Sequence, residues 1–172
     1  MTDWKALIRS IPDFPSPGVV FRDITPLLRD PVGLEAVVEE LAAGFSRGDV
    51  DAVAAIESRG FMFGAPVAIR LGAGFIPSRK LGKLPGATLT RSYDLEYGAG
   101  HLEMHRDALR AGERILLVDD VLATGGTAAA AAGMVEELGG RILEIGFVIE
   151  LPALGGRARL PEQHAVRALA SF

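Results

Sequence analysis

Two adjacent carboxylates and a turn rich in threonine and glycine form the part of the sequence with the clearest chemistry. Asp119 and Asp120 end an apolar stretch that is typical of a buried strand, and the turn 124–127 (Thr-Gly-Gly-Thr) opens a predicted helix. The N–H groups of such a turn and the partial positive charge of a helix N-terminus favour a phosphate group. Carboxylates beside it can accept hydrogen bonds from sugar hydroxyls. We therefore predict a site for a phosphorylated sugar, in preference to a plain strand–turn–helix with solvated acids.

Two common phosphate-binding motifs do not describe this turn. It lacks the Gly-Lys-Ser/Thr sequence of a Walker A loop. The stretch Gly72-Ala73-Gly74 continues as Phe-Ile-Pro, so the third glycine of a dinucleotide fingerprint is missing.

Two further groups of basic residues could bind an anion. Arg59 follows a second predicted strand and can pair bidentately with phosphate, although an isolated arginine at a helix start more often covers apolar surface. Arg79, Lys80 and Lys83 form the densest basic cluster, within a predicted long loop over residues 78–100. A basic loop is usually only a solvated surface, but a loop this long in a compact domain is usually functional or disordered.

Short apolar stretches that alternate with helical ones must position these residues. The predicted strands span residues 52–56, 75–77, 114–118 and 142–149, and the predicted helices span residues 61–71 and 127–138. A further helix is expected after Asp30 as N-cap and Pro31, and Trp4, Leu7, Ile8 and Ile11 predict a helix that ends at Pro12. Apolar strands alternating with helices indicate a parallel sheet covered on both faces, with ligands at the carboxyl ends of its strands.

Composition excludes several classes of protein. The chain has 172 residues, which suits one domain, and it has no cysteine, which excludes disulfides, thiolate metal sites and a cysteine nucleophile. Its three histidines share no ligand spacing with acids, so we expect no metal held by the protein alone. The net charge of -4 argues against a general nucleic-acid coat. No apolar stretch reaches the ~18 residues of a membrane span, and no signal peptide is visible, so a cytoplasmic protein is expected.

The turn and four other stretches resemble known proteins. Val118–Thr127 is similar to the phosphoribosyl pyrophosphate (PRPP) motif of the type I phosphoribosyltransferases. Further stretches resemble the adenine phosphoribosyltransferase family in the same order along the chain, over about residues 8–151. These stretches are Phe14–Pro26, Glu57–Phe61, Arg79–Pro85 and Tyr93–Gly98.

This resemblance implies a fold and a reaction. The fold is α/β, with a twisted, mainly parallel sheet, helices on both faces and one domain over residues 1–172. A small hood from about residues 1–30 and 150–172 is expected over the strand ends, and a mobile loop over about residues 79–100 is expected to close the site. The reaction is the purine-salvage transfer in which adenine and PRPP give AMP and pyrophosphate. The resemblance further implies a homodimer, and Mg²⁺ carried on the oxygens of PRPP.

The resemblance also implies which residues bind each part of the substrates. Those that match the ribose 5-phosphate site are Asp119, Asp120, Ala123, Thr124, Gly125, Gly126 and Thr127. Those that match the pyrophosphate site are Ser58, Arg59, Arg79, Lys80 and Lys83. Those that match the adenine site are Val20, Phe21, Arg22 and Leu151.

Base choice and proton transfer point to further residues. Backbone groups at Val20 and Arg22 would meet adenine with a polarity that a 6-oxopurine reverses, leaving buried groups unpaired at about 1–3 kcal/mol each. In the 6-oxopurine transferases the position that matches Ala123 is an aspartate that handles the base proton, which alanine cannot do. Glu96 is then the candidate for this proton, with Tyr97 beside it, because the matching pair in the family lies beside adenine.

Two other functions stay open at this point. One is a regulator that senses PRPP and has lost catalysis, but residues 1–30 are too short and too rich in proline for a winged helix. The other is the same transfer to a different base. Turnover assays with adenine, guanine, hypoxanthine, xanthine and orotate would separate these possibilities.

Overall fold

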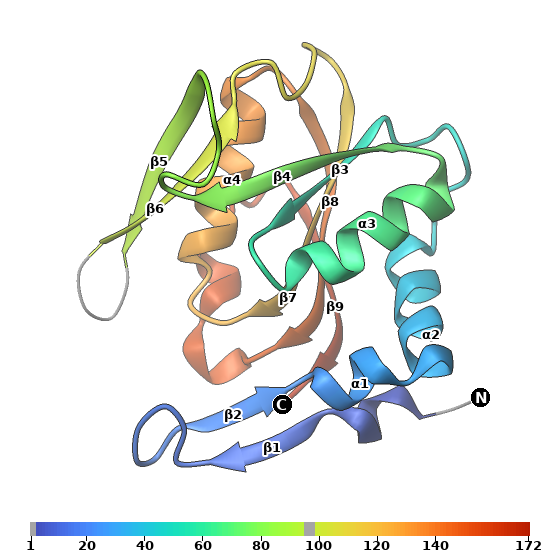
Figure 1. Ribbon diagram of the computed structural model, residues 1–172, viewed down its shortest axis with the longest axis vertical. Helices are drawn as coiled ribbons and strands as arrows, with labels where there is room; N and C mark the ends of the chain where they lie inside the picture. The colour runs from blue at the N-terminus through green and yellow to red at the C-terminus, as the bar shows by residue number, and fades with distance from the viewer. Residues whose placement is uncertain (1–2, 95–98) are drawn as a thin grey trace.

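The computed structural model describes residues 3–94 and 99–172, and its centre is a seven-stranded sheet (Figure 1). The strands are β3 (Ala52–Ile56), β4 (Gly74–Lys80), β5 (Thr88–Asp94), β6 (Ala99–His105), β7 (Arg114–Leu122), β8 (Arg141–Glu150) and β9 (Ala165–Ser171). Their order across the sheet is β5-β6-β4-β3-β7-β8-β9. The five neighbouring strands β4, β3, β7, β8 and β9 are parallel, whereas β6 is antiparallel to both β4 and β5. The predicted mainly parallel sheet is therefore confirmed.

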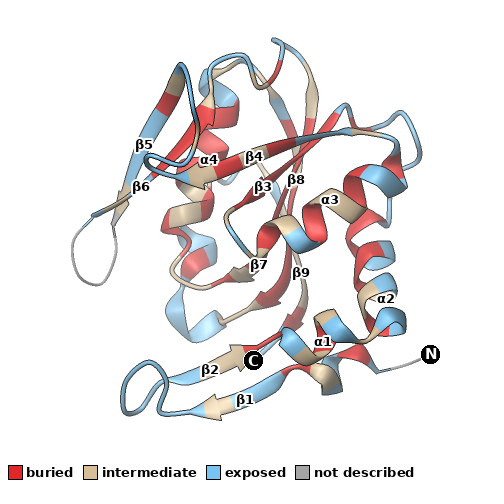
Figure 2. Cartoon of the chain, viewed as in Figure 1, coloured by how far each residue is buried: buried red, intermediate tan, exposed pale blue. Residues whose placement is uncertain are grey.

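Helices cover both faces of this sheet, as predicted. Helices α2 (Pro31–Ala42) and α3 (Gly60–Leu71) pack on one face, and α4 (Gly126–Glu137) packs on the other (Figure 1). Buried residues accordingly lie along the central strands and on parts of all three helices (Figure 2). No helix among residues 3–94 and 99–172 is long and apolar enough to cross a membrane.

Smaller elements lie before and after this core. At the N-terminal end they are a 3-10 helix (Trp4–Leu7), a two-stranded sheet of β1 (Arg9–Pro12) and β2 (Val20–Asp23), and helix α1 (Thr25–Arg29). After β8 come two further 3-10 helices, Pro152–Leu154 and Gly156–Arg159. In Figure 1 the N-terminal sheet lies at the end of the molecule toward which β7 and β9 run.

The elements with the strongest local signals form as predicted. All five residues of β3 are buried, as a strand flanked by two parallel neighbours requires. Helix α2 begins at Pro31, and the side chain of Asp30 accepts a hydrogen bond of 2.7 Å from the N–H of Gly33. This bond satisfies one of the N–H groups that a helix start leaves without an internal partner.

The prediction of an N-terminal helix up to Pro12 was wrong after Leu7. Arg9–Pro12 instead pairs with Val20–Asp23, and Ile11 lies opposite Phe21. The apolar spacing that suggested a helix comes from Trp4 and Ile8, which are buried on either side of a change from 3-10 helix to strand.

The predicted loop over residues 78–100 was also wrong for most of its length. Strand β4 continues to Lys80, and Thr88–Asp94 forms β5, which pairs with β6. Strand β7 likewise continues past Val118 to Leu122, and β9 was not predicted. These segments are strands because neighbouring strands hydrogen-bond to them, a cause that local periodicity does not reveal.

The contact between α3 and the sheet depends on a glycine. A Cβ atom on Gly64 would lie 2.5 Å from Cβ of Ala55 and 3.2 Å from Cε2 of Phe75. Gly64 therefore sets how closely α3, and the loop that precedes it, approach β3.

Gly64→Ala is expected to lower the free energy of unfolding by about 1–3 kcal/mol, even though alanine favours helices, because the added methyl forces the helix away from β3. Gly74→Ala is the matched control, since a Cβ there would meet its nearest neighbour at 3.5 Å. The control should change stability by no more than about 0.5 kcal/mol. Urea denaturation, followed by the fluorescence of buried Trp4, measures both variants; equal losses would contradict this role of Gly64.

Candidate functional site

Asp119 and Asp120 lie within β7 rather than beyond its end, which corrects the prediction from sequence. Pairing between β7 and β8 continues to Leu122, opposite Glu150, so the strand carries both acids. Asp120 is buried, with 4% of its surface exposed, and Asp119 is half-buried. The two carboxylates therefore stand at the carboxyl edge of the sheet, where ligands of parallel α/β folds bind.

The predicted phosphate turn connects β7 to α4. Gly125 precedes α4 with a φ of 81°, a conformation that glycine adopts readily, and no side chain caps this helix start. The first N–H groups of α4 are thus available to an anion. A cavity of about 60 Å³ lies here. It is lined by Asp119, Val121, Leu122, Ala123, Thr124, Gly125, Thr127 and Ala128.

A backbone contact that sequence reasoning missed supports this turn. A Cβ atom on Gly125 would collide with the carbonyl of Gly156, and one on Gly156 would collide with the carbonyl of Ala123. The 3-10 helix at Gly156–Arg159 therefore packs directly on the turn. The only signal for it in the sequence was the pair Gly155-Gly156.

Arg59 neutralises part of the acid pair. Its Nε lies 2.7 Å from Oδ2 of Asp120, and its guanidinium lies 5.5 Å from the ring centre of Phe21. Space for α3 beside the acids requires Gly60, because a Cβ there would lie 2.8 Å from Oδ1 of Asp119. The structure therefore brings together three residues that are far apart in the sequence, from β2, the start of α3 and β7.

Burial governs the ionisation of this pair. Burial raises the pKa of Asp119 well above its usual value, and the adjacent charge of Asp120 raises it further. Burial also raises the pKa of Asp120, although the Arg59 guanidinium opposes that shift. A ligand that donates hydrogen bonds to these carboxylates would stabilise their ionised forms.

Two other predicted anion-binding residues, Arg79 and Lys80, contact a glutamate whose role was not predicted. Glu57, at the end of β3, accepts hydrogen bonds through Oε2 from Nε of Arg79 (3.1 Å) and from the N–H of Lys80 (2.9 Å). Ser58 and Arg59 follow Glu57 directly in the chain, whereas the Arg59 side chain pairs with Asp120. Lys80 and Lys83 are both exposed on the surface.

The residues expected to hold the base lie on β2 and after β8. The Phe21 ring packs edge-on against Phe14, with ring centres 5.2 Å apart, and faces Arg59. The Arg22 side chain instead donates to Ser10 and lies 4.8 Å from the ring centre of Phe172. Val20 is exposed on the same strand.

Leu151, the remaining residue of the expected base site, donates its N–H to the carbonyl of Leu122 (2.9 Å) and so lies beside the end of β7. Glu96 and Tyr97, the predicted catalytic residues, lie outside the described residues.

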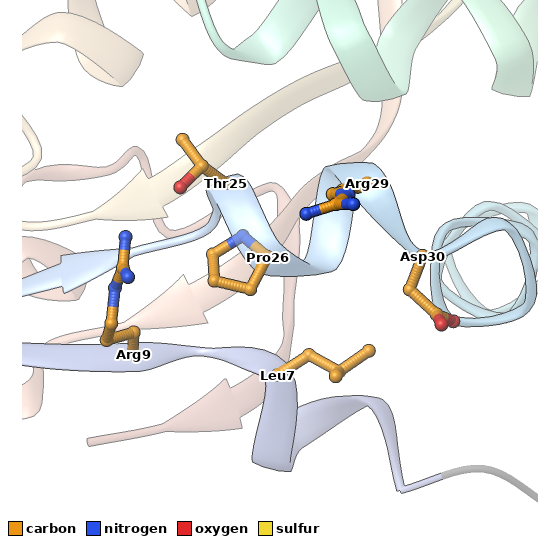
Figure 3. Close-up of a pocket in the computed structure, with 6 residues that line it drawn as sticks. All are labelled: Leu7, Arg9, Thr25, Pro26, Arg29 and Asp30. Atoms are coloured by element: carbon orange, nitrogen blue, oxygen red, sulfur yellow. The ribbon is translucent and has the colours of Figure 1, made fainter.

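A larger cavity, of about 550 Å³, lies between the N-terminal sheet and α1 (Figure 3). Its arginines are Arg9 and Arg29, but Arg9 is paired with Asp23, and Asp30 already caps α2. Its lining shares no residue with the cavity at the turn.

The fold and this site define a class of protein that binds a phosphorylated ribose. A family model described as a phosphoribosyl transferase domain matches residues 30–168. Adenine phosphoribosyltransferases of Nitrosospira multiformis and Acidothermus cellulolyticus are 57% and 58% identical to the chain. The first match covers 92% of this chain and 91% of the relative, and the second covers 91% and 88%. A solved adenine phosphoribosyltransferase from Thermoanaerobacter pseudethanolicus superposes with a TM-score of 0.93 at 48% identity, over 99% of this chain and 98% of that one.

The chain belongs to the adenine phosphoribosyltransferase family, which confirms the resemblance seen in its motifs.

Arg59→Met is expected to lower the free energy of unfolding at pH 8 by about 1–3 kcal/mol, because it leaves a buried Asp120 carboxylate without its cation. The loss stays below that of a fully buried pair, since 39% of the Arg59 side chain is exposed. A raised folded pKa means that the folded state holds a proton to higher pH than the unfolded state, so stability falls as pH rises. The deficit of this variant should therefore shrink from pH 8 to pH 5.

Chemical denaturation across this pH range measures the effect. In the control, Arg59→Met is combined with Asp120→Asn, which removes the acid and should make the deficit independent of pH. A deficit of Arg59→Met that stays constant from pH 8 to pH 5 would show that the ion pair does not set the ionisation of Asp120.

Proposed function

We propose that this chain transfers the 5-phosphoribosyl group of PRPP to N9 of adenine and releases pyrophosphate, using the acid pair and uncapped helix start described above. The observation that carries this proposal is the position of Asp119 and Asp120 beside the turn before α4, with Arg59 against them. Family membership supports the choice of reaction. Related enzymes of Saccharomyces cerevisiae and Giardia lamblia, 39% and 38% identical, were solved with adenine and with 9-deazaadenine respectively.

In this proposal the 5-phosphate lies at the N-terminus of α4. The turn from Ala123 to Thr127, including Thr124, Gly125 and Gly126, offers N–H and hydroxyl donors to its oxygens. The ribose hydroxyls donate to Asp119 and Asp120, whose ionised forms they stabilise against the cost of burial.

The pyrophosphate group lies on the cations beside Glu57. Ser58, Arg59, Arg79, Lys80 and Lys83 supply donors and positive charge, which stabilise the negative charge that builds on the leaving group as the glycosidic bond breaks. Mg²⁺ would come with PRPP, bound mainly to its phosphate oxygens. Mg²⁺ would neutralise charge on the pyrophosphate.

The base would lie beside β2. Phe21 offers a ring face, Leu151 covers the opposite side, and backbone groups of Val20 and Arg22 meet the polar edge of adenine. Fixed backbone polarity favours adenine over 6-oxopurines, because the wrong base leaves buried donors and acceptors unpaired.

A proton must leave the base as N9 attacks C1′. Glu96 is the proposed acceptor, because Ala123 occupies the position of the acid used by 6-oxopurine enzymes, and Tyr97 would orient it. A mobile segment over residues 79–100 that covers the site and keeps water from the sugar cation also remains a prediction. Within it, residues 79–80, 88–94 and 99–100 lie on strands.

The proposed enzyme is a cytoplasmic homodimer, with small molecules rather than nucleic acid or membrane as partners. The family resemblance supports this assembly. Met62 and Ile69 support it too, since they lie on one face of α3 with 46% and 77% of their surfaces exposed. Sedimentation velocity of the chain in solution tests the oligomeric state.

The combined variant Asp119→Asn, Asp120→Asn is expected to weaken PRPP binding and to reduce turnover of adenine to near zero. Neutral amides lose the charge that accepts the ribose hydroxyls, while they keep the size of the buried groups. The assay compares adenine, guanine, hypoxanthine, xanthine and orotate as acceptors for the native chain. Wild-type turnover by the variant would exclude this sugar site. If instead the native chain bound PRPP but transferred it to none of these bases, the protein would be a PRPP sensor rather than an enzyme.

Glu96→Gln is expected to lower kcat by about 10²–10⁴-fold, the usual contribution of general acid–base catalysis. The affinity for PRPP should change little, since the residue is proposed to act on the base. Tyr97→Phe is the comparison, with a smaller loss. Steady-state kinetics and PRPP titration measure both; an undiminished kcat for Glu96→Gln would assign proton transfer to solvent or Asp119.

A further inference from the structure

The guanidinium of Arg79 is held at two points by other parts of the chain. Its Nε donates to Oε2 of Glu57 at 3.1 Å, and its Nη1 donates to the carbonyl of Lys83 at 3.2 Å. A guanidinium has five N–H groups, so three remain for an anion. About a third of the side chain, 34%, is exposed, so these groups are accessible.

Glu57 fixes the first of these points. Its side chain is largely buried, with 13% exposed, and its Oε2 also accepts from the N–H of Lys80 at 2.9 Å. Its own N–H donates to the carbonyl of Ser78 at 2.8 Å. Glu57 therefore ties the end of β3, just before Ser58 and Arg59, to the end of β4.

Glu103 fixes the second point indirectly. It lies on β6 directly opposite Arg79 and is 3% exposed. Its Oε1 accepts from the N–H groups of Lys83 (2.8 Å) and Leu84 (2.6 Å). Although burial alone would raise the pKa of Glu103, hydrogen bonds from Leu84, Lys83 and Gly82 hold this pKa below its usual value. An ionised carboxylate thus anchors the residue whose carbonyl holds Arg79.

We propose that Glu57 and Glu103 are positioning residues that together aim Arg79 at the pyrophosphate group of PRPP. This inference rests on the proposed function. An arginine loses much rotamer freedom when it is ordered by a ligand, and two anchors remove part of that loss in advance. Donors that are already oriented also stabilise a developing charge better than donors that must rearrange.

Charge alone makes the opposite prediction for Glu57. Its carboxylate lies beside the proposed pyrophosphate site and repels an anion. If it acted only through its charge, removing it would tighten the binding of pyrophosphate. If it orients Arg79, removing it weakens that binding, so the sign of the change separates the two roles.

Glu57→Ala is expected to raise the KM for PRPP and the inhibition constant of pyrophosphate by about tenfold, the effect of losing one charge-assisted hydrogen bond. Glu57→Gln keeps an acceptor for Arg79 and should stay within about threefold of the native chain. Glu103→Ala should behave as Glu57→Ala does, and Glu103→Gln should again be milder. The affinity for ribose 5-phosphate, which lacks the pyrophosphate group, should be unchanged in all four variants.

A double-mutant cycle with Arg79→Gln shows whether the glutamates act through this arginine. In that background, Glu57→Ala should change pyrophosphate inhibition by less than about twofold, because the residue it orients is gone. Glu144→Gln is the matched control. Its partner Arg167 lies at 2.7 Å, and the two side chains are 18% and 28% exposed. It removes a similar ion pair away from the site and should leave both constants unchanged.

Several outcomes would overturn the inference. A positioning role would be excluded if Glu57→Ala bound pyrophosphate more tightly than the native chain. It would also be excluded if the variant lost ribose 5-phosphate affinity to the same extent, or if its effect were fully additive with that of Arg79→Gln. If Arg79→Gln weakens pyrophosphate binding but none of the glutamate variants does, the inference fails and the proposed function stands. If Arg79→Gln changes neither constant, the assignment of Arg79 to pyrophosphate fails as well. Thermal unfolding confirms folding, and the glutamine variants supply the test if an alanine variant does not fold.

Discussion

The ion pair between Arg59 and Asp120 sets the geometry of the end of the sheet. Two neighbouring carboxylates in a buried strand repel each other and lose hydration, so a cation must approach them closely. The cation comes from the residue before α3, and α3 can begin there only because Gly60 leaves room beside Asp119. Gly64, further along the helix, lets α3 pack closely against β3, so the whole helix can lie near the sheet. The acid pair and the packing of the helix therefore depend on each other.

Within the described part of the chain, the acid pair and the helix start beside it both lack partners that a ligand could supply. The acids have raised pKa values, and the Arg59 guanidinium lies against them. The start of α4 beside them has no side-chain cap. An acidic surface that accepts hydroxyl donors thus adjoins a helix start that attracts an anion. A ribose phosphate carries both kinds of group, which is why the proposed function assigns the sugar and its phosphate to this one turn.

Two of the cations proposed to bind the leaving group, Arg79 and Lys80, lie on a strand rather than in a loop. Arg79 and Lys80 end β4, and their positions are determined by Glu57, just after β3, and by the pairing of β4 with β6. In the proposed function, each anchoring glutamate would lower the net positive charge near the pyrophosphate. In return it would fix the direction of the donors, and oriented donors stabilise a developing charge better than mobile ones.

Local sequence determined the elements whose signals lie within one segment. The buried strand at 52–56, the helix that Asp30 caps, and the turn at 124–127 were predicted because apolar runs, caps and glycines act over a few residues. The family motifs indicated the family and the reaction, and the comparisons confirm both. Tertiary structure decided the rest: that Asp119 and Asp120 lie inside a strand, that residues 88–94 are a strand, that β9 extends the sheet, and that Gly156 packs on the turn. Each of these depends on a partner distant in the chain, and the energy of such a contact is not encoded in either segment alone.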